Sequence, residues 1–264
     1  MNLTHAQPRA IMLASGSGGN VLFLEAGPAR VLVDAGLPAE TIARSLDGVG
    51  IDARTISVIL LTHEHDDHAG GAGALSRHFG IPVMANAATV AAAGTSLNGA
   101  AIARFDTGLP FQVGPFVVTA FPVSHDAAEP VGFAFRAGAR QITVAIDLGS
   151  ADETIDPYLA EADLVILESN YDLRLLNVSA YPWFLKNRIL GPKGHLSNDD
   201  AARALARTAA GRSRLIFLAH LSEVNNLTAL ARDTALEAIT RRGSAGHHVV
   251  AVPPNGRAGA IVLG

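Results

Sequence analysis

The sequence predicts an α/β fold in which helices enclose two β-sheets, built as a single domain over residues 1–264. Short apolar segments rich in β-branched residues recur along the whole chain, which is typical of buried strands. Segments with helical spacing of apolar residues separate many of them. Hydrophobic residues make up 49% of the chain, enough for one large core, and no low-complexity linker or repeat marks a domain boundary.

The apolar segments all have the length of single strands. They occupy residues 10–13, 21–25, 30–34, 57–62, 82–85, 116–123, 131–135, 141–147, 164–168, 215–220 and 247–252. The early segments form groups typical of hairpins, whereas the later ones alternate with helices. This order favours a mixed α/β chain.

Six segments carry apolar residues at the spacing of three and four that predicts helices. They are residues 39–47, 69–79, 153–161, 182–189, 198–209 and 228–242. Ser197 and Asn198 are suited to cap the start of the 198–209 helix, because their side chains can accept from free backbone N–H groups. Two aspartates follow at once, where the positive end of the helix dipole favours them.

Composition excludes several classes of protein. Twenty basic against 24 acidic residues give a net charge of −4, which excludes a strongly basic protein that coats nucleic acid but allows a local basic groove. The absence of cysteine excludes disulfide scaffolds, thiolate zinc sites and cysteine nucleophiles. The apolar runs are far shorter than the ~20 residues of a membrane span, and no signal-peptide pattern opens the chain. We therefore expect a cytoplasmic protein without membrane contact.

An aromatic content of 5% argues against a platform that stacks bases.

One segment concentrates metal-ligand residue types. An apolar strand ends at Thr62, and His63, His65, Asp67 and His68 follow within six positions. His63 and His65 are two apart and can share a face of an extended turn. Imidazole and carboxylate groups are the ligands that zinc, manganese and iron accept in proteins. The alternative, a solvated polar loop, is disfavoured because three of the ten histidines fall so close together.

Three further ligand residues share a position in the pattern. His125, Asp147 and His220 each stand at the carboxyl end of an apolar strand. One such residue would more often be a structural polar group. Three of them, beside a histidine-rich loop at a fourth strand end, favour convergence on one rim of the sheets.

These residues, in this order, resemble the signature of the metallo-β-lactamase superfamily. The resemblance implies a four-layer αββα sandwich with two divalent ions at one edge of the sheets. It also implies the ligand roles: His63, His65 and His125 for one ion, Asp67, His68 and His220 for the other, and Asp147 as the bridge between them.

Further segments resemble the YycJ/WalJ-like branch of that superfamily, described as metal-dependent nucleases acting on DNA ends. They are residues 14–20, 33–37, 168–172, 194–198 and 220–226. The run Gly194-His195-Leu-Ser197 also resembles the Gly-His-Ala-Ser element of the β-CASP nucleases, whose histidine contacts the scissile phosphate. One departure is Tyr171, which stands where the branch usually has histidine.

The resemblance implies a dinuclear phosphodiesterase acting on DNA in the manner of an exonuclease, with a metal-bridged hydroxide as nucleophile. The ions expected are zinc or manganese, or iron. Asp67 and His195 are the expected catalytic residues, and Asn170, His195 and Ser197 the expected substrate contacts. Lys186, Arg188 and Lys193 form either a basic strip for DNA or a solvated helix face.

Other interpretations stay open at this point. The same metals would serve a hydrolase of thioesters, lactones or a small cyclic phosphate, and a non-catalytic metal-binding regulatory protein is the third class. Residues 15–20 lack the ending of a P-loop, so a tight turn beneath the metals is favoured over phosphate contact. Asp34 is either an acceptor that orients a ligand imidazole or an Asx-turn residue.

Overall fold

The strands of the computed structural model form two mixed sheets. The structure describes residues 7–209, 211, 215–254 and 258–262, and this part contains two seven-stranded sheets. Sheet A has the order β14-β1-β2-β3-β4-β5-β6, and sheet B has the order β13-β12-β11-β10-β9-β8-β7. The strands are β1 (Arg9–Ala14), β2 (Val21–Ala26), β3 (Ala29–Val33), β4 (Val58–Leu60), β5 (Val83–Ala85), β6 (Ile102–Arg104), β7 (Pro110–Val113), β8 (Phe116–Pro122), β9 (Val131–Ala137), β10 (Arg140–Ala145), β11 (Leu164–Glu168), β12 (Leu215–Ala219), β13 (His248–Ala251) and β14 (Ala258–Val262).

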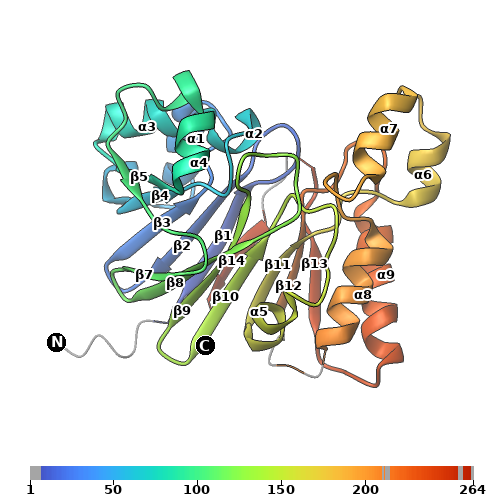
Figure 1. The fold of residues 1–264 in the computed structure, drawn as a ribbon. Coiled ribbons are helices and arrows are strands. Elements are labelled where there is room, and N and C mark those ends of the chain that lie inside the picture. The colour runs from blue at the N-terminus through green and yellow to red at the C-terminus, as the bar shows by residue number, and fades with distance from the viewer. Residues whose placement is uncertain (1–6, 210, 212–214, 255–257, 263–264) are drawn as a thin grey trace.

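Helices cover the outer faces of both sheets (Figure 1). The helices of the described residues are α1 (Ala39–Asp47), α2 (Asp66–Ala69), α3 (Ala72–Phe79), α4 (Ala87–Ala92), α5 (Asp156–Glu161), α6 (Leu173–Val178), α7 (Trp183–Leu190), α8 (Asn198–Thr208) and α9 (Thr228–Arg241), of which α6 and α7 belong to neither layer. One apolar cluster fills the space between the sheets. A second joins sheet A to α1 and α3, and a third joins sheet B to α5, α8 and α9. The predicted αββα sandwich is confirmed.

The central strands of both sheets are buried on both faces, which explains their nearly continuous apolar sequences. Along β11, Leu164 and Ile166 point into the cluster between the sheets, while Val165 and Leu167 pack against the helices. Successive side chains of a strand point to opposite faces, so such a strand contributes to two apolar clusters. The sequences of these strands therefore do not alternate between apolar and polar residues.

Strand direction determines where functional residues gather. In sheet B, β10, β11, β12 and β13 are parallel neighbours, and in sheet A the parallel neighbours are β3, β4, β5 and β6. Carboxyl ends of parallel strands lie at one edge of a sheet, where open α/β folds bind ligands. Both sheets present these ends to the same side of the sandwich.

Several elements differ from the predicted ones. The helix predicted over residues 69–79 is interrupted at Gly70 and Gly71: its first residue is the end of α2, and the remainder is α3. At Gly71 a Cβ atom would lie 2.0 Å from the carbonyl oxygen of Leu37, so only glycine fits there. The helix predicted over 153–161 begins later, at Asp156. Three short strands, β6, β7 and β14, and two short helices, α4 and α6, were not predicted; their few residues give too short a pattern.

No helix within the described residues is long and apolar enough to cross a membrane.

Candidate metal centre

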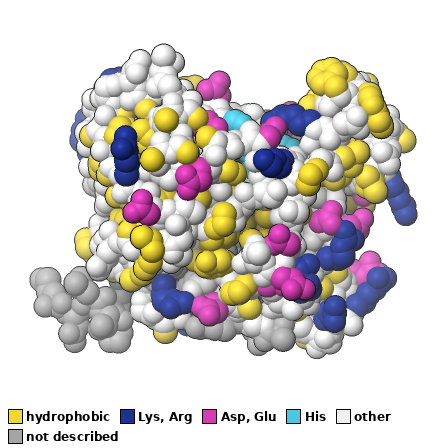
Figure 2. Space-filling model, viewed as in Figure 1, with side chains coloured by type: hydrophobic (Ala, Val, Ile, Leu, Met, Phe, Trp, Pro, Cys, Tyr) yellow, Lys and Arg dark blue, Asp and Glu magenta, His cyan; other side chains and the backbone are white. Residues whose placement is uncertain are grey.

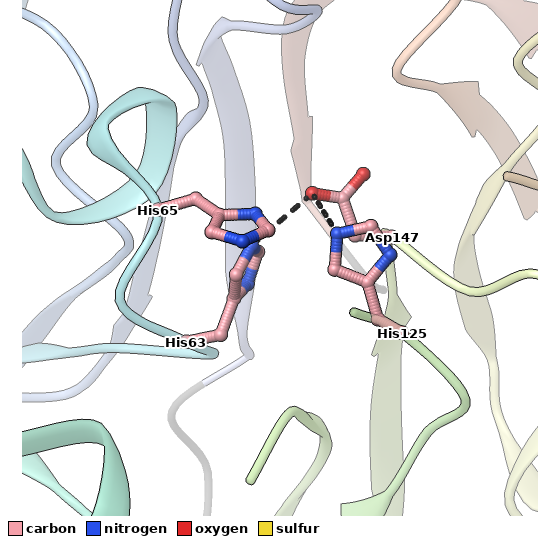
Figure 3. A group of neighbouring side chains, drawn as sticks. All are labelled: His63, His65, His125 and Asp147. Atoms are coloured by element: carbon pink, nitrogen blue, oxygen red, sulfur yellow. Dashed lines mark ion pairs between the residues drawn. The ribbon is translucent and has the colours of Figure 1, made fainter. Parts of the chain in front are cut away.

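Four predicted ligands meet at the edge where the carboxyl ends of the strands gather. Figure 3 shows His63 and His65, from the segment after β4, facing Asp147 and His125, which follow strands of sheet B. Asp147 Oδ2 lies 3.4 Å from His63 Nε2 and 3.7 Å from His125 Nε2. One ligand atom of each of the four residues lies within 4.8 Å of the others.

A second group of predicted ligands surrounds the same carboxylate. Asp147 Oδ2 lies 2.8 Å from His68 Nε2, and Asp147 Oδ1 lies 3.3 Å from His220 Nδ1. Asp67 Oδ2 lies 3.6 Å from the Nε2 atoms of both His68 and His220. The structure thus brings all seven predicted ligands together, with Asp147 common to the two groups.

The backbone is strained at three of the strand ends. Among the described residues other than glycine, those with positive φ are Asp34 at 61°, Asp147 at 58° and His220 at 54°. This left-handed conformation costs an ordinary L-residue roughly 1–2 kcal/mol. Each of the three immediately follows a strand of the parallel region or stands two residues beyond it. The left-handed turn redirects each side chain from the sheet face into the centre, and such strain is typical of functional sites.

The donor atoms fit divalent metal ions. His63 Nε2 and His220 Nε2 are buried and have no hydrogen-bond partner among the described residues. Leaving a buried polar atom unpaired costs ~1–3 kcal/mol, so two of them aimed at one carboxylate cluster need an explanation. Coordination of a cation by the imidazole nitrogens and carboxylate oxygens satisfies all these atoms, and this donor set suits zinc, manganese or iron.

Charges in the cluster shift several pKa values in opposite directions. Burial by itself raises the pKa of Asp147, but the charges on His220 and His68 outweigh it, so this pKa lies well below its usual range. Burial by itself lowers the pKa of His68, yet the carboxylates of Asp34 and Asp147 raise it well above the usual value. The same competition raises the pKa of His220 to about 9. The charged forms of His68 and His220 are thus stabilised beside Asp147, whereas burial lowers the pKa of His63 and of His125.

Asp34 orients one of the ligand imidazoles. Its Oδ2 lies 2.7 Å from Nδ1 of His68, and its Oδ1 accepts from the backbone N of Thr62 at 2.8 Å. The carboxylate fixes the proton on Nδ1 and leaves Nε2 of His68 to face the centre. Of the two interpretations of Asp34, the structure supports the acceptor.

Two residues of the turn at 15–20 pack beneath the centre, while a third, Ser17, lines the cavity. Ser15 Oγ accepts from the backbone N of His220 at 2.7 Å, and Asn20 Nδ2 lies 3.0 Å from His68 Nε2. A Cβ atom at Gly36 would lie 1.7 Å from the carbonyl oxygen of Asp67, so the 33–37 segment needs glycine there to approach the ligand loop.

A third group contains a carboxylate that the sequence analysis did not single out as a site residue. Glu168 is completely buried at the end of β11, and its Oε1 lies 2.7 Å from His195 Nδ1 and 3.3 Å from His220 Nδ1. Burial lowers the pKa of His195, but Glu168 and Asp147 together raise it to about 10. The signal was available: Glu168 ends its apolar strand just as Asp147 and His220 follow theirs.

The remaining predicted residues lie around the centre in different ways. His195 lines a cavity of about 290 Å³ together with ligands of both groups and Arg188. Asn170 and Ser197 are buried and do not line this cavity. Asn170 Nδ2 donates to the carbonyl oxygen of His220 at 2.8 Å. Ser197 caps α8, accepting from Asp200 N at 3.0 Å. Their contact with substrate stays a prediction.

Two residues of the predicted basic strip make different contacts. Arg188 lies beside the cavity and pairs with Asp126 at 2.6 Å, whereas Lys186 Nζ donates to the carbonyl oxygen of Asn177 on α6. Tyr171 is buried in a small apolar cluster beneath α6 and α7. Burial raises the pKa of Tyr171 to about 12. Tyr171 therefore contributes packing at the position where the resembling branch has histidine.

Comparisons with known proteins agree with this geometry. The family model described as a beta-lactamase superfamily domain matches residues 29–220. The exodeoxyribonuclease YycJ of Bacillus anthracis is 36% identical over 235 residues, covering 88% of this chain and 89% of the relative. The exodeoxyribonuclease WalJ of Streptococcus pneumoniae is 35% identical, covering 87% of each protein.

Solved structures share the fold at low identity. The metallo-β-lactamase fold protein YhfI from Bacillus subtilis superposes with a TM-score of 0.73 at 15% identity, over 96% of this chain and 99% of that one. The short form of human tRNase Z gives a TM-score of 0.66 at 17% identity, over 97% and 99% of the two chains. Family, relatives and fold agree with the ligand cluster: the chain belongs to the metallo-β-lactamase superfamily and is a metal-dependent hydrolase of its YycJ/WalJ-like branch.

Proposed function

We propose that the protein is a dinuclear phosphodiesterase that degrades DNA from an end. The observation that carries the proposal is the sharing of Asp147 between two ligand groups that open, with His195, onto one cavity. The names of the relatives that are 35–36% identical, both exodeoxyribonucleases, support DNA as the substrate.

In this proposal each group would hold one divalent ion, zinc, manganese or iron. His63, His65 and His125 would hold the first ion, Asp67, His68 and His220 the second, and Asp147 is shared by the two groups. Two ions so placed would supply a water-derived nucleophile at neutral pH and would neutralise charge on the phosphoryl oxygens. No nucleophilic side chain is then required, in agreement with the absence of cysteine.

His195 is the proposed contact to the scissile phosphate. Its Nδ1 is engaged by Glu168 at 2.7 Å, so the opposite ring nitrogen, Nε2, is the one available to a substrate in the cavity. Because the buried carboxylate of Glu168 stabilises its charged form, the imidazole can donate a hydrogen bond to the phosphate or a proton to the leaving oxygen. Asp67 is catalytic in the sense that it would hold an ion at the cavity wall, where Arg188 also lies, paired with Asp126.

The decisive experiment offers several ester classes to the purified protein. We expect 5′-labelled and 3′-labelled DNA to be shortened progressively from one end with manganese or zinc present, and chelation to abolish the reaction. RNA, bis(nitrophenyl) phosphate, a thioester and a lactone are tested in parallel. If a thioester or lactone is hydrolysed with a far higher kcat/KM than any phosphodiester, the rival hydrolase function replaces this one.

A further inference from the structure

The α6–α7 segment forms an arm beside the metal centre (Figure 1). We define the arm as residues 172–194. Its two helices enclose a small apolar cluster of their own, formed by Tyr171, Leu176 and Ile189 with Tyr181 and Leu185 at its margin. The arm is thus a compact projection rather than part of either helical layer.

The outer surface of the arm carries large apolar side chains. Trp183 is 73% exposed and the adjacent Phe184 is 74% exposed, with Val178 exposed on α6. Trp183 is the only tryptophan of the chain. Figure 2 shows hydrophobic side chains gathered over the α6–α7 region, with Lys or Arg side chains between them and the histidines. Exposing two adjacent aromatic rings is costly, and such groups commonly mark binding surfaces.

The charge of the arm is opposite to that of the whole protein. It contains one acidic residue, Asp172, and four basic residues, so its net charge is +3 in a chain of net charge −4. The basic residues are Arg174, Lys186, Arg188 and Lys193. Lys186 and Lys193 are the only lysines of the protein. A polyanion is therefore the partner that this surface complements.

The base of the arm is bonded to the loops of the metal centre. Ser124 Oγ donates to the carbonyl oxygen of Pro192 at 2.6 Å, and His125 Nδ1 lies 3.0 Å from the carbonyl oxygen of Gly194. Arg188 lines the metal cavity, while Trp183 and Phe184 lie one turn earlier on the same helix. A DNA strand that leaves the cavity along α7 would first pass Arg188, which pairs with Asp126, and would then reach the exposed rings of Trp183 and Phe184.

We propose that the arm binds a single-stranded stretch of DNA next to the scissile phosphate, with Trp183 and Phe184 stacking on bases and the lysines contacting phosphates. The inference rests on the proposed function and adds the form of the substrate: an end that is unpaired for a few nucleotides. Base stacking on aromatic side chains tolerates any sequence because every base has a π-face. The low aromatic content counted against such a platform, but the position of two rings matters more than their share of the composition.

A second copy of this chain is the other occupant to consider for these rings. Self-association through apolar side chains needs area but no aromatic face and no positive charge. The net charge of +3 would place like charges opposite each other in a symmetric pair of arms. DNA is favoured for this reason, and self-association becomes an outcome of the test.

The test uses Trp183 as its own reporter. A phosphorothioate oligothymidylate of about 12 nucleotides, which resists hydrolysis, is added to the metal-loaded protein. Stacking should quench the tryptophan fluorescence, and anisotropy of a labelled oligonucleotide gives the affinity. Trp183→Leu, which keeps apolar bulk but lacks a π-face, should weaken binding about tenfold or more. Trp183→Phe should restore most of it. Val117→Ala, at an exposed site near the opposite edge of sheet B, should change nothing.

The dependence of DNA affinity on salt concentration tests the contribution of the two lysines. Replacing Lys186 and Lys193 by glutamine removes two phosphate contacts, so the slope of log affinity against log salt should become shallower by about 1.4. Arg241→Gln, an exposed change at the end of α9, is the matched control. On nuclease substrates, Trp183→Leu should raise the KM for single-stranded DNA and leave the rate on bis(nitrophenyl) phosphate within twofold.

Three outcomes overturn the inference. The first is tryptophan fluorescence that is not quenched at a saturating concentration of the oligonucleotide. The second is an affinity for the oligonucleotide that is equal in the Trp183→Leu variant and the wild type. The third is loss of a dimer in the Trp183→Leu variant, by sedimentation, with DNA affinity unchanged, which makes the arm a self-association surface. Failure of the wild type to cleave any DNA would instead contradict the proposed function, and the binding measurements would still report on the arm.

Discussion

Nδ1 of His195 lies 2.7 Å from Oε1 of Glu168, a carboxylate with no exposed surface. The two residues come from segments 27 positions apart, one the end of β11 and the other the loop before α8. The contact holds the imidazole against the cavity wall in one orientation. Glu168 is therefore a positioning residue that acts through His195.

Removal of the His195 side chain should lower the rate of hydrolysis of DNA much more than that of an activated ester. His195→Ala should lower kcat on DNA by ~10²–10⁴-fold, the usual cost of losing a positioned proton donor. The loss should be much smaller on bis(nitrophenyl) phosphate, whose leaving group needs no proton. Metal content should be unchanged, and His78→Ala, an exposed histidine on α3, serves as the control.

Glu168→Gln should reproduce the same split between substrates to a smaller extent, because the amide can still hold the ring but carries no charge. Equal losses of the His195→Ala variant on both substrates would make His195 a phosphate-binding group. Loss of bound metal in that variant would make His195 a ligand instead.

Asp147→Ala should lower the metal content of the protein. Wild type purified without chelator should contain more than one equivalent of divalent metal and up to about two. The variant should retain about one or fewer, since both ligand groups lose their common carboxylate. Elemental analysis measures this, with Asp233→Ala on α9 as the control. A protein that is fully active with one ion, or with none, contradicts the dinuclear proposal.

Metal binding should release protons. The pKa of His220 is raised to about 9 and that of His68 lies well above its usual value, so both rings carry a proton at pH 7 in the metal-free protein. A cation binds only the neutral ring and must displace those protons. Apparent metal affinity should therefore rise with pH through the neutral range and level off above about pH 9.

Calorimetric titration of metal into metal-free protein checks this, in two buffers of different ionisation enthalpy. The observed heats should differ by the enthalpy of the released protons, and the difference should shrink in His220→Ala. Identical heats in both buffers would show that the histidines are neutral before the metal binds.

Two substitutions at Asp34 should separate its effect on His68 from its hydrogen bond to the backbone of Thr62. Asn tolerates the positive φ at this position, so Asp34→Asn keeps the backbone but removes the charge opposite His68. Metal affinity should fall by ~10–100-fold, as for other partners of ligand histidines. Asp34→Ala should in addition destabilise the metal-free protein by ~1–3 kcal/mol, because the buried N–H of Thr62 loses its acceptor. Equal stability of the two variants in urea would contradict this account.

The order of residues along the chain was sufficient to predict which side chains gather at the centre, while their roles as ligands came from the resemblance to the superfamily. His63, His65, Asp67 and His68 stand within six positions, and His125, Asp147 and His220 follow strands whose apolar residues make their ends easy to locate. The αββα layers were predictable for the same reason, since long buried strands and amphipathic helices alternate in one order. Short elements such as β6 and α6 escaped because a few residues give no recognisable period.

The tertiary structure alone decided which residues support the ligands. Glu168 reaches His220 because β11 pairs with β12 in parallel register, and it meets His195 on the loop before α8; no local pattern encodes either contact. Asp34 meets His68 across 34 positions through the pairing of β3 with β4. The exposure of Trp183 depends on α7 standing outside both helical layers. Sequence spacing is enough to predict a site whose residues are close together in the chain. Where the residues are far apart, the order of the strands and the direction in which each strand ends decide which side chains meet, because such contacts form only when the two sheets pack.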